Sequence, residues 1–243
     1  MMGPMARPIQ VPIEDRLIVA LDLPTVAAAR VMAERLDGIV SFFKLGLWLI
    51  FAPGFDLLLE DLVAQGKRVF LDAKMFDIGE TVKQGVARAA ERGASFVTVH
   101  GDRDIIAAAV EGKRGSDLRI LAITVLTSID DSGARDLGHM LPVAELIRRR
   151  VGICTELGCD GVIASPHDVG AIRRVPGADQ LLVVTPGVRL PGAALDDHKR
   201  TGSPSQAIAA GADYLVVGRP IVQAPDPAEA ASRIIADMKQ GAA

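Results

Sequence analysis

The chain has 243 residues, of which 49% are hydrophobic and 23% are charged, and its mean hydropathy is +0.30. This composition is typical of a compact globular protein with a large core, and it excludes an intrinsically disordered chain. The formal net charge of −3 argues against a protein that binds nucleic acid through bulk positive charge. Any anionic ligand would therefore have to be bound by local groups.

Cysteine usage and the amino-terminal residues indicate the compartment. Cys154 and Cys159 are too few for a disulfide framework or a tetrahedral zinc site, so we interpret them as reduced packing thiols of a cytoplasmic protein. No apolar core of signal-peptide length opens the chain, and no run approaches about 18 apolar residues. We expect neither export nor membrane insertion. Residues 1–12 are expected to form a loose extension before a single domain over 13–243.

Eight short apolar runs alternate with amphipathic segments along the chain, and they predict eight strands with helices between them. Near-continuous apolar strands separated by helices are typical of a parallel sheet that is buried on both faces. The first three connecting helices are expected at 24–36, 48–65 and 80–92. The expected strands are residues 17–23, 41–47, about 69–74, 96–100, 120–126, 161–165, 181–185 and 214–217.

Eight strand–helix units in a chain of this length predict an α/β protein of one domain, a closed (β/α)8 TIM barrel. An open doubly wound sheet is the alternative. No Gly-x-Gly-x-x-Gly follows the first strand, which weakens a dinucleotide-binding interpretation.

Charged side chains gather where the first three strands end. Asp22 ends the first strand, Lys44 lies in the second, and Asp72 and Lys74 end the third on one face. Because neighbouring strands lie roughly 4.8 Å apart, these residues predict a patch of alternating sign at the barrel mouth. A lysine between carboxylates stays protonated, which makes Lys74 a candidate proton donor. A purely structural ion pair is the alternative.

Glycine and arginine follow the last two strands, in Thr-Pro-Gly-Val-Arg at 185–189 and Val-Gly-Arg-Pro at 217–220. Barrels commonly bind phosphate at this place, through backbone N–H groups and charge-assisted hydrogen bonds. Ordinary turns are the alternative. The segment from 190 to about 205 is rich in Pro, Gly and charge, and we predict that it is a lid, with a surface excursion as the alternative.

Taken in order, these segments resemble the orotidine 5′-phosphate decarboxylase family across nearly the whole predicted barrel. The Asp-x-Lys-x-x-Asp motif alone is shared with sugar-phosphate decarboxylases and synthases of the same superfamily, so the specificity lies in the full set. The residues that carry the resemblance are Asp22, Lys44, Asp72-x-Lys74-x-x-Asp77-Ile78, Val-Leu-Thr-Ser at 125–128, and the segments 185–189 and 217–220.

The resemblance implies decarboxylation of orotidine 5′-phosphate (OMP) to UMP in pyrimidine biosynthesis, with no cofactor and no metal. It implies that Lys74 protonates C6 of the ring, that Asp72 lies beside the departing carboxylate, and that Lys44 and Asp77 complete the charged network. The substrate-binding residues that it implies are Asp22 and Lys44 at the ribose, Thr127 and Ser128 at the pyrimidine, Arg189, Gly218 and Arg219 at the phosphate, and also Asp72, Ile78, Thr81, Pro186 and His198.

The resemblance also implies a homodimer in which Asp77 and Thr81 reach into the site of the neighbouring subunit.

Two residues depart from the family pattern. Gly79 stands where a proline is usual, so we expect more backbone freedom in that turn. His198 stands where the family lid brings a glutamine to the phosphate, and its charge would depend on pH near neutrality.

The chemistry expected from the residues agrees with this reading. Loss of CO2 leaves a carbanion, and with no cofactor motif in the sequence its stabilisation would come from fixed charge, with Lys74 as the nearest cation. Asp72 beside the substrate carboxylate would disfavour the ground state. Two alternatives remain: a metal-dependent sugar-phosphate decarboxylase or synthase of the same superfamily, and a non-catalytic barrel that binds a nucleotide monophosphate.

Other candidate residues receive structural interpretations. His100 ends the fourth strand without a matching histidine at another strand end, so we interpret it as a barrel-mouth residue and not as a metal ligand. Trp48 and Tyr214 are interpreted as packing residues.

Overall fold

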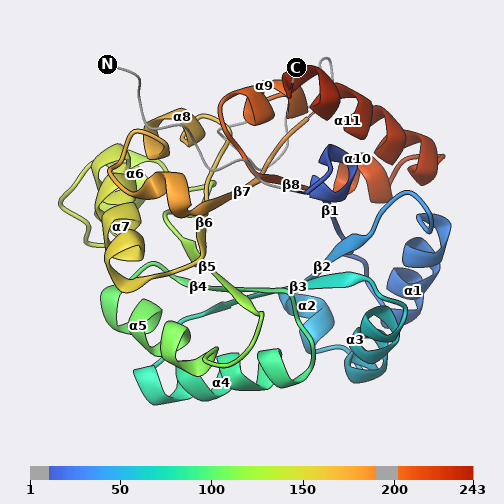
Figure 1. The fold of residues 1–243 in the computed structure, drawn as a ribbon, viewed down its shortest axis with the longest axis horizontal. Helices are drawn as coiled ribbons and strands as arrows, with labels where there is room; N and C mark the ends of the chain where they lie inside the picture. Colours follow the sequence, from blue (N-terminus) through green and yellow to red (C-terminus); the bar gives the residue numbers. More distant parts are fainter. Residues whose placement is uncertain (1–10, 190–201, 243) are drawn as a thin grey trace.

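A computed structural model describes residues 11–189 and 202–242 of the chain. Eight parallel strands pair in sequence order and close into a barrel, with β8 paired to β1. Figure 1 looks into this ring of strands, which is surrounded by helices. The prediction of a single-domain (β/α)8 barrel is confirmed, and the open-sheet alternative is excluded. Of the predicted loose extension over 1–12, only residues 11 and 12 are described.

The strands are β1 (Leu17–Ala20), β2 (Phe42–Gly46), β3 (Arg68–Met75), β4 (Phe96–His100), β5 (Arg119–Ile123), β6 (Gly161–Ile163), β7 (Leu182–Pro186) and β8 (Tyr214–Val217). The helices are α1 (Val26–Arg35), α2 (Leu47–Ile50), α3 (Phe55–Ala64), α4 (Gly79–Glu91), α5 (Arg103–Gly112), α6 (Asp131–Asp136), α7 (Val143–Leu157), α8 (Val169–Ile172), α9 (Pro204–Ala209), α10 (Arg219–Val222) and α11 (Pro227–Gly241). Short 3-10 turns occur at Ile13–Arg16 and Ala178–Gln180.

The predicted helix over 48–65 is wrong, because two helices occupy this segment. α2 ends at Ile50 and α3 begins at Phe55. Gly54 has a φ of +82°, a left-handed conformation that ends any helix and that glycine adopts without strain. Pro53 also disfavours the helical conformation in the residue before it. Strands β1, β5 and β6 end earlier than predicted. The polar residues that follow them, such as Asp22, Thr127 and Ser165, therefore lie in loops.

Aromatic side chains plug the barrel near the amino ends of its strands. Phe42, Phe96 and Tyr214 are the first residues of β2, β4 and β8. Their rings pack edge to face, with centroids 4.9 Å apart for Phe42 and Phe96 and 5.3 Å apart for Phe96 and Tyr214. Tyr214 is therefore the packing residue that the sequence predicted. Since this end is filled, the polar side chains at the opposite end of the barrel lie above an apolar floor.

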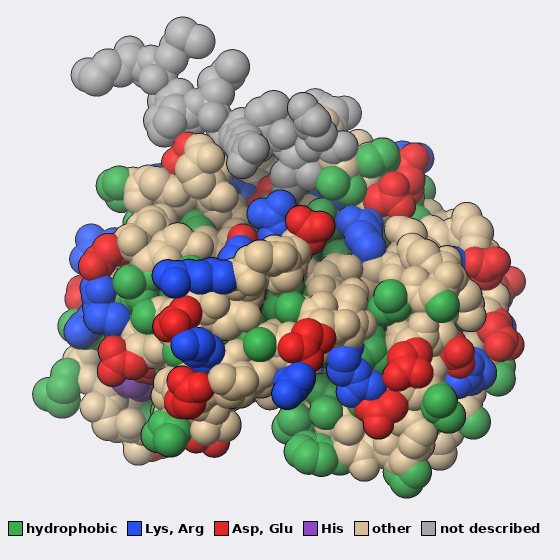
Figure 2. Space-filling model, turned by 60° about the horizontal axis from the view of Figure 1, so that its bottom comes forward, with side chains coloured by type: hydrophobic (Ala, Val, Ile, Leu, Met, Phe, Trp, Pro, Cys, Tyr) green, Lys and Arg blue, Asp and Glu red, His purple; other side chains and the backbone are tan. Residues whose placement is uncertain are grey.

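A second apolar layer lies between the barrel and its helices, and the outer surface is polar. Val86 of α4 and Ile106 of α5 are fully buried in this layer. On the outer side, the Lys83 ammonium of α4 lies 2.6 Å from the Glu111 carboxylate of α5. Figure 2 shows basic and acidic side chains intermixed over the face that it presents. This face offers no extended area of positive charge to a polyanion.

The two buried cysteines belong to the end of α7. The Cys159 N–H donates to the Cys154 carbonyl at 3.0 Å, around Gly158 with its φ of +70°. This is a Schellman closure, which brings the two side chains flanking the turn together. Neither thiol is in a disulfide, in agreement with the interpretation of packing thiols.

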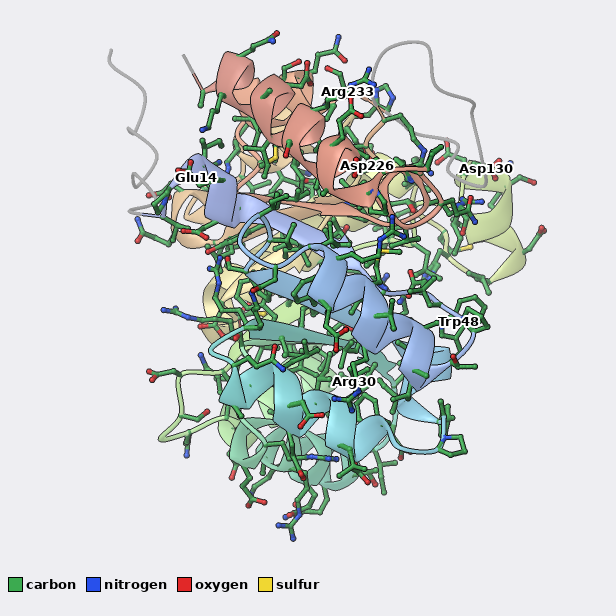
Figure 3. All side chains as sticks on the ribbon, turned by 90° about the vertical axis from the view of Figure 1, so that its right-hand side faces the viewer. Glu14, Arg30, Trp48, Asp130, Asp226 and Arg233 are labelled. Carbon is green, nitrogen blue, oxygen red and sulfur yellow. The ribbon has the colours of Figure 1, made fainter. Side chains whose placement is uncertain are left out.

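The two ends of the barrel differ in what they expose. In Figure 3, Trp48 after β2 and Asp130 after β5 lie at one end, and Glu14 before β1 lies at the other. The carboxyl ends of the strands therefore meet at the end marked by Trp48. Within the described part of the chain, every helix is too short or too polar to span a bilayer.

Candidate functional site

A cavity of about 870 Å³ opens at the carboxyl ends of the strands. This size is in the range of small-molecule binding sites. Apolar side chains such as Ile123, Ile163 and Val216 form much of its wall. The predicted site residues that line it are Asp22, Lys44, Asp72, Lys74, Thr127, Pro186, Arg189, Gly218 and Arg219.

Lys44 lies between two carboxylates at the base of the cavity. Its Nζ is 3.0 Å from Asp22 Oδ1 and 3.2 Å from Asp72 Oδ2. Burial by itself favours the neutral amine, but the attraction and hydrogen bonds of Asp72 and Asp22 outweigh it and raise the pKa of Lys44. This lysine therefore carries its charge inside the barrel.

Asp72 joins the two lysines of the site. Its Oδ2 also lies 2.6 Å from Lys74 Nζ, and its side chain is only 12% exposed. Burial by itself raises the pKa of a carboxyl, but Lys44, Lys74 and a hydrogen bond from Thr98 outweigh it and lower the pKa of Asp72. The predicted patch is thus a chain of ion pairs, Asp22–Lys44–Asp72–Lys74. Lys74 is its outermost cation, with a side chain that is 38% exposed.

The contact of Asp72 with Lys74 was predicted, but the strand that makes it is irregular. In the pairing of β3 with β4, Leu71 aligns with Val97 and Met75 aligns with Val99, so β3 bulges between them. Lys74 has a φ of +48°, and it is the one non-glycine residue with positive φ in the ranges 11–189 and 202–242. Such a conformation costs about 1–3 kcal/mol and occurs often at functional sites.

Thr98 was missed by the sequence analysis. It lies in β4 opposite the bulge, and its fully buried hydroxyl donates to Asp72 Oδ1 at 2.9 Å. The hydroxyl oxygen of Thr98 also accepts a hydrogen bond from the backbone N–H of Lys74 at 3.0 Å. One available signal was that strand alternation places Thr98 on the same face as Phe96, which packs inside the barrel.

Gly46 is a second residue that the sequence analysis missed. A Cβ atom at this position would lie 2.3 Å from Asp22 Oδ1, which is far inside van der Waals contact. Gly46 also pairs with Asp72 across β2 and β3. The absence of a side chain here leaves the space in which Asp22 reaches Lys44.

The glycine–arginine segments lie together at the cavity wall. Arg189 follows β7, and Gly218 precedes Arg219, the first residue of α10. A Cβ atom on Gly218 would meet the Ala20 side chain at 3.4 Å, so the backbone approaches the end of β1 closely. The Arg189 N–H donates to the Gly202 carbonyl at 3.0 Å. Most of the predicted lid, including His198, lies between Arg189 and Gly202, outside the described part of the chain. The last residues of the predicted segment are described, and Pro204 and Ser205 belong to α9.

Some predicted residues lie outside the cavity of their own chain. Asp77, Ile78, Thr81 and Ser128 are absent from its lining. Asp77 Oδ1 accepts the Ile78 N–H at 2.7 Å, and Ile78 is 74% exposed. Gly79 begins α4 without a positive φ, so the expected extra backbone freedom is not used.

Two aromatic residues stand at the rim. Trp48 is 60% exposed and Phe51 is 81% exposed, and both line the cavity. The interpretation of Trp48 as a packing residue is therefore wrong.

His100 is half-buried beside the Phe76 ring at 4.9 Å, and burial lowers its pKa. No group of three or more His, Cys, Asp or Glu side chains within the described residues has the arrangement of a metal site.

Fold and site together define a (β/α)8-barrel protein with a linear chain of ion pairs at the carboxyl ends of the strands, in which the two central members, Lys44 and Asp72, are buried. Comparison with known proteins then names the family. Residues 15–234 match the model of the "Orotidine 5'-phosphate decarboxylase / HUMPS family". The chain belongs to this family.

Named relatives cover almost all of the chain. It is 49% identical over 224 residues to the orotidine 5′-phosphate decarboxylase of Methylobacterium radiotolerans, covering 92% of this chain and 96% of the relative. The enzyme of the same name from Bradyrhizobium diazoefficiens is 48% identical over 96% of this chain and 98% of its own. The crystal structure of orotidine 5′-phosphate decarboxylase from Lactobacillus acidophilus superimposes with a TM-score of 0.81 at 34% identity, over 92% of this chain and 99% of that one.

Proposed function

We propose that this chain is a carboxy-lyase that converts OMP to UMP and CO2, using neither a cofactor nor a metal ion. The observation that carries the proposal is the chain of ion pairs that ends in Lys74 at the cavity wall. The relatives at 48–49% identity that bear the name of this enzyme support the choice of substrate.

The chemical step follows from the positions of Asp72 and Lys74. The bond between C6 and the carboxylate breaks, its electron pair stays on C6, and CO2 leaves. The Lys74 ammonium then gives a proton to C6 and recovers one from solvent. Lys74 is suited to this role because its side chain is 38% exposed, whereas that of Lys44 is only 9% exposed. A fixed cation beside the developing carbanion is electrostatic stabilisation of the kind that dominates many enzymes.

Asp72 acts on the ground state. Since its pKa is lowered, it is ionised at neutral pH, and it is held in place by Lys44, Lys74 and Thr98. A substrate carboxylate placed beside it experiences repulsion that is relieved when CO2 leaves. Lys44 keeps this negative charge in position.

The rest of the substrate would bind along the cavity wall. We assign the ribose hydroxyls to Asp22 and Lys44, and the phosphate to Arg189, Gly218 and Arg219, which lie together after β7 and β8. Arginine forms charge-assisted hydrogen bonds that suit a phosphate. We assign the pyrimidine to Thr127, which lines the cavity with Pro186, and to Ser128, which follows Thr127 in the chain but is not part of the lining. His198 is proposed to reach the phosphate from the predicted lid.

We also propose a cytoplasmic homodimer. Phe76 and Ile78 expose large apolar surfaces beside Asp77, outside the cavity of their own chain. Exposed apolar surface of this kind is typical of an interface. In the dimer, Asp77 and Thr81 would enter the site of the partner subunit and extend its chain of charges.

A direct assay tests the proposed reaction. Purified protein is mixed with OMP in the presence of a chelator, and the pyrimidine absorbance is followed. We expect conversion to UMP at an undiminished rate after exhaustive chelation. Activity that depends on added metal would indicate a sugar-phosphate enzyme of the same superfamily. UMP binding without any turnover would indicate a non-catalytic barrel.

A further inference from the structure

We propose that Thr98 is a positioning residue of this site, because one hydroxyl fixes both the Asp72 carboxylate and the Lys74 backbone. The inference rests on the proposed function, and it adds a residue that touches neither the cavity nor the reacting atoms. Its role is to set where the Lys74 ammonium stands.

The direction of both hydrogen bonds is determined by chemistry. The Lys74 N–H can only donate, and the ionised Asp72 carboxylate can only accept. The Thr98 hydroxyl therefore accepts from Lys74 N at 3.0 Å and uses its single proton toward Asp72 Oδ1 at 2.9 Å. The hydroxyl thus makes one hydrogen bond as acceptor and one as donor, to the two residues proposed to act on the substrate.

Thr98 binds the Asp72 carboxylate oxygen that neither lysine contacts. Lys44 and Lys74 both approach Oδ2, at 3.2 and 2.6 Å. The bond from Thr98 goes to Oδ1. The last torsion of an aspartate side chain is soft, so contacts at one oxygen do not fix the plane of the carboxylate. With both oxygens bound, the carboxylate plane is set, and with it the place of the Lys74 ammonium.

Thr98 also supports the strained backbone of Lys74. The β3 bulge takes Lys74 out of regular pairing with β4, so its N–H lacks the carbonyl partner of a regular ladder. Thr98 lies between Val97 and Val99, the residues that flank the bulge on β4. Its hydroxyl replaces that partner and stabilises a backbone with φ of +48°. A valine would fill the same space but would offer neither bond.

The first test compares Thr98→Val with Thr98→Ser. We expect Thr98→Val to lower kcat about 10- to 100-fold, the loss typical of a hydrogen bond to a charged group, with little change in KM or UMP affinity. Thr98→Ser keeps the hydroxyl and should return kcat to within about threefold. A purely structural role would lower the melting temperature in both variants and would not separate kcat from KM. Equal kcat in the parent and Thr98→Val, or equal loss in both variants, would overturn the proposal.

The pH profile is a second readout. The charged groups that face Asp72 are Lys44 from β2 and Lys74 from β3, and Lys44 in turn pairs with Asp22 from the loop after β1. A hydrogen bond to the ionised form favours that form, so its loss raises the pKa of Asp72. The acid limb of kcat/KM should therefore move to higher pH in Thr98→Val and remain in place in Thr98→Ser. An unmoved limb in Thr98→Val would count against the proposal.

Thr185→Val is the matched control. Although Thr185 begins the segment 185–189, it is fully buried in β7 and does not line the cavity, and its hydroxyl has no hydrogen-bond partner among the described residues. The same change of side chain there removes no bond and should leave kcat within about twofold. A loss equal to that of Thr98→Val would point to a general effect of buried threonine and would overturn the proposal.

Crystal structures of the two Thr98 variants separate this proposal from the proposed function. We expect a rotated Asp72 carboxylate and a displaced Lys74 Nζ in Thr98→Val, and parent positions in Thr98→Ser. Unchanged atoms in Thr98→Val would overturn the positioning role, whatever the activity of the parent. Failure of the parent to decarboxylate OMP would overturn the proposed function alone.

Discussion

The Lys44 ammonium and the Asp72 carboxylate lie 3.2 Å apart, and the two side chains are only 9% and 12% exposed. Removing one member of such a pair leaves the other charge buried without compensation. Loss of either charge is therefore expected to destabilise the fold as well as to disturb the site.

Lys44→Met keeps most of the side-chain volume and removes the charge. We expect the free energy of unfolding to fall by about 3 kcal/mol, because Asp72 loses one of its two cations in a buried place. Urea denaturation measures the loss. Lys83→Met is the control, since it removes a shorter ion pair, at 2.6 Å, on the outer surface of α4 and should change little. Equal losses in the two variants would contradict a special role for burial.

The pKa shifts of the pair set the pH range of its contribution. The pKa of Asp72 is lowered by Lys44 and Lys74 despite burial, so its contribution is present above the unfolded value of about 3.9 and is lost as pH falls through the folded value. The pKa of Lys44 is raised despite burial, so its contribution is present below about 10.4 and is lost as pH rises through the folded value.

We therefore expect the stability difference between the parent and Asp72→Asn to be constant from about pH 5 to 9 and to shrink in stronger acid. Denaturation at a series of pH values tests this. A difference that disappears near neutrality would contradict an Asp72 pKa below its ordinary value.

Sequence reasoning located the strands and the charged ends of the first three because both are local signals. Apolar runs mark strands wherever they stand, and a charge at the end of such a run is visible without the fold. The alternation of side chains along a strand also predicted that Asp72 and Lys74 lie on the same face. It did not predict the bulge at Lys74, because the register shift is visible only in the pairing of β3 with another strand, β4.

The role of Gly46 was missed for a related reason. The space that its missing side chain leaves is filled by Asp22, which comes from a different strand end. The break between α2 and α3 was missed although Pro53 and Gly54 were an available signal, and Trp48 lies exposed in α2 before that break. The first error concerns a contact between distant parts of the chain, and the second concerns two residues that interrupt a helix.

Mixing two inactive variants tests the proposed dimer. Lys74→Ala and Asp77→Ala should each be inactive alone, while UMP still binds to the first. If Asp77 serves the partner's site, a hybrid dimer has one intact site, and random mixing should restore about one quarter of parent activity. Lys74→Ala mixed with Asp72→Ala is the control and should restore nothing, because both residues serve the same site. No recovery in the first mixture would place Asp77 in its own subunit's site or outside both.

Gly46→Ala tests the space beside Asp22. The added Cβ would stand 2.3 Å from Asp22 Oδ1, so the carboxylate must leave Lys44. We expect KM for OMP to rise about tenfold, the loss of roughly one hydrogen bond to a ribose hydroxyl. Gly152→Ala in α7 is the control, because a Cβ there has no atom within 4 Å and should leave KM unchanged. An unchanged KM in Gly46→Ala would remove Asp22 from the ribose site.

Arg219→Ala tests the phosphate site at the start of α10. The guanidinium lines the cavity beside Gly218, where a phosphate would also meet backbone N–H groups. Loss of a charge-assisted hydrogen bond should raise KM for OMP about 10- to 100-fold. Orotidine, which lacks the phosphate, provides the control, because parent and variant should process it at the same low kcat/KM. If kcat/KM falls equally for OMP and orotidine, Arg219 acts on the ring or on the fold. The phosphate would then have to be assigned elsewhere along the cavity wall.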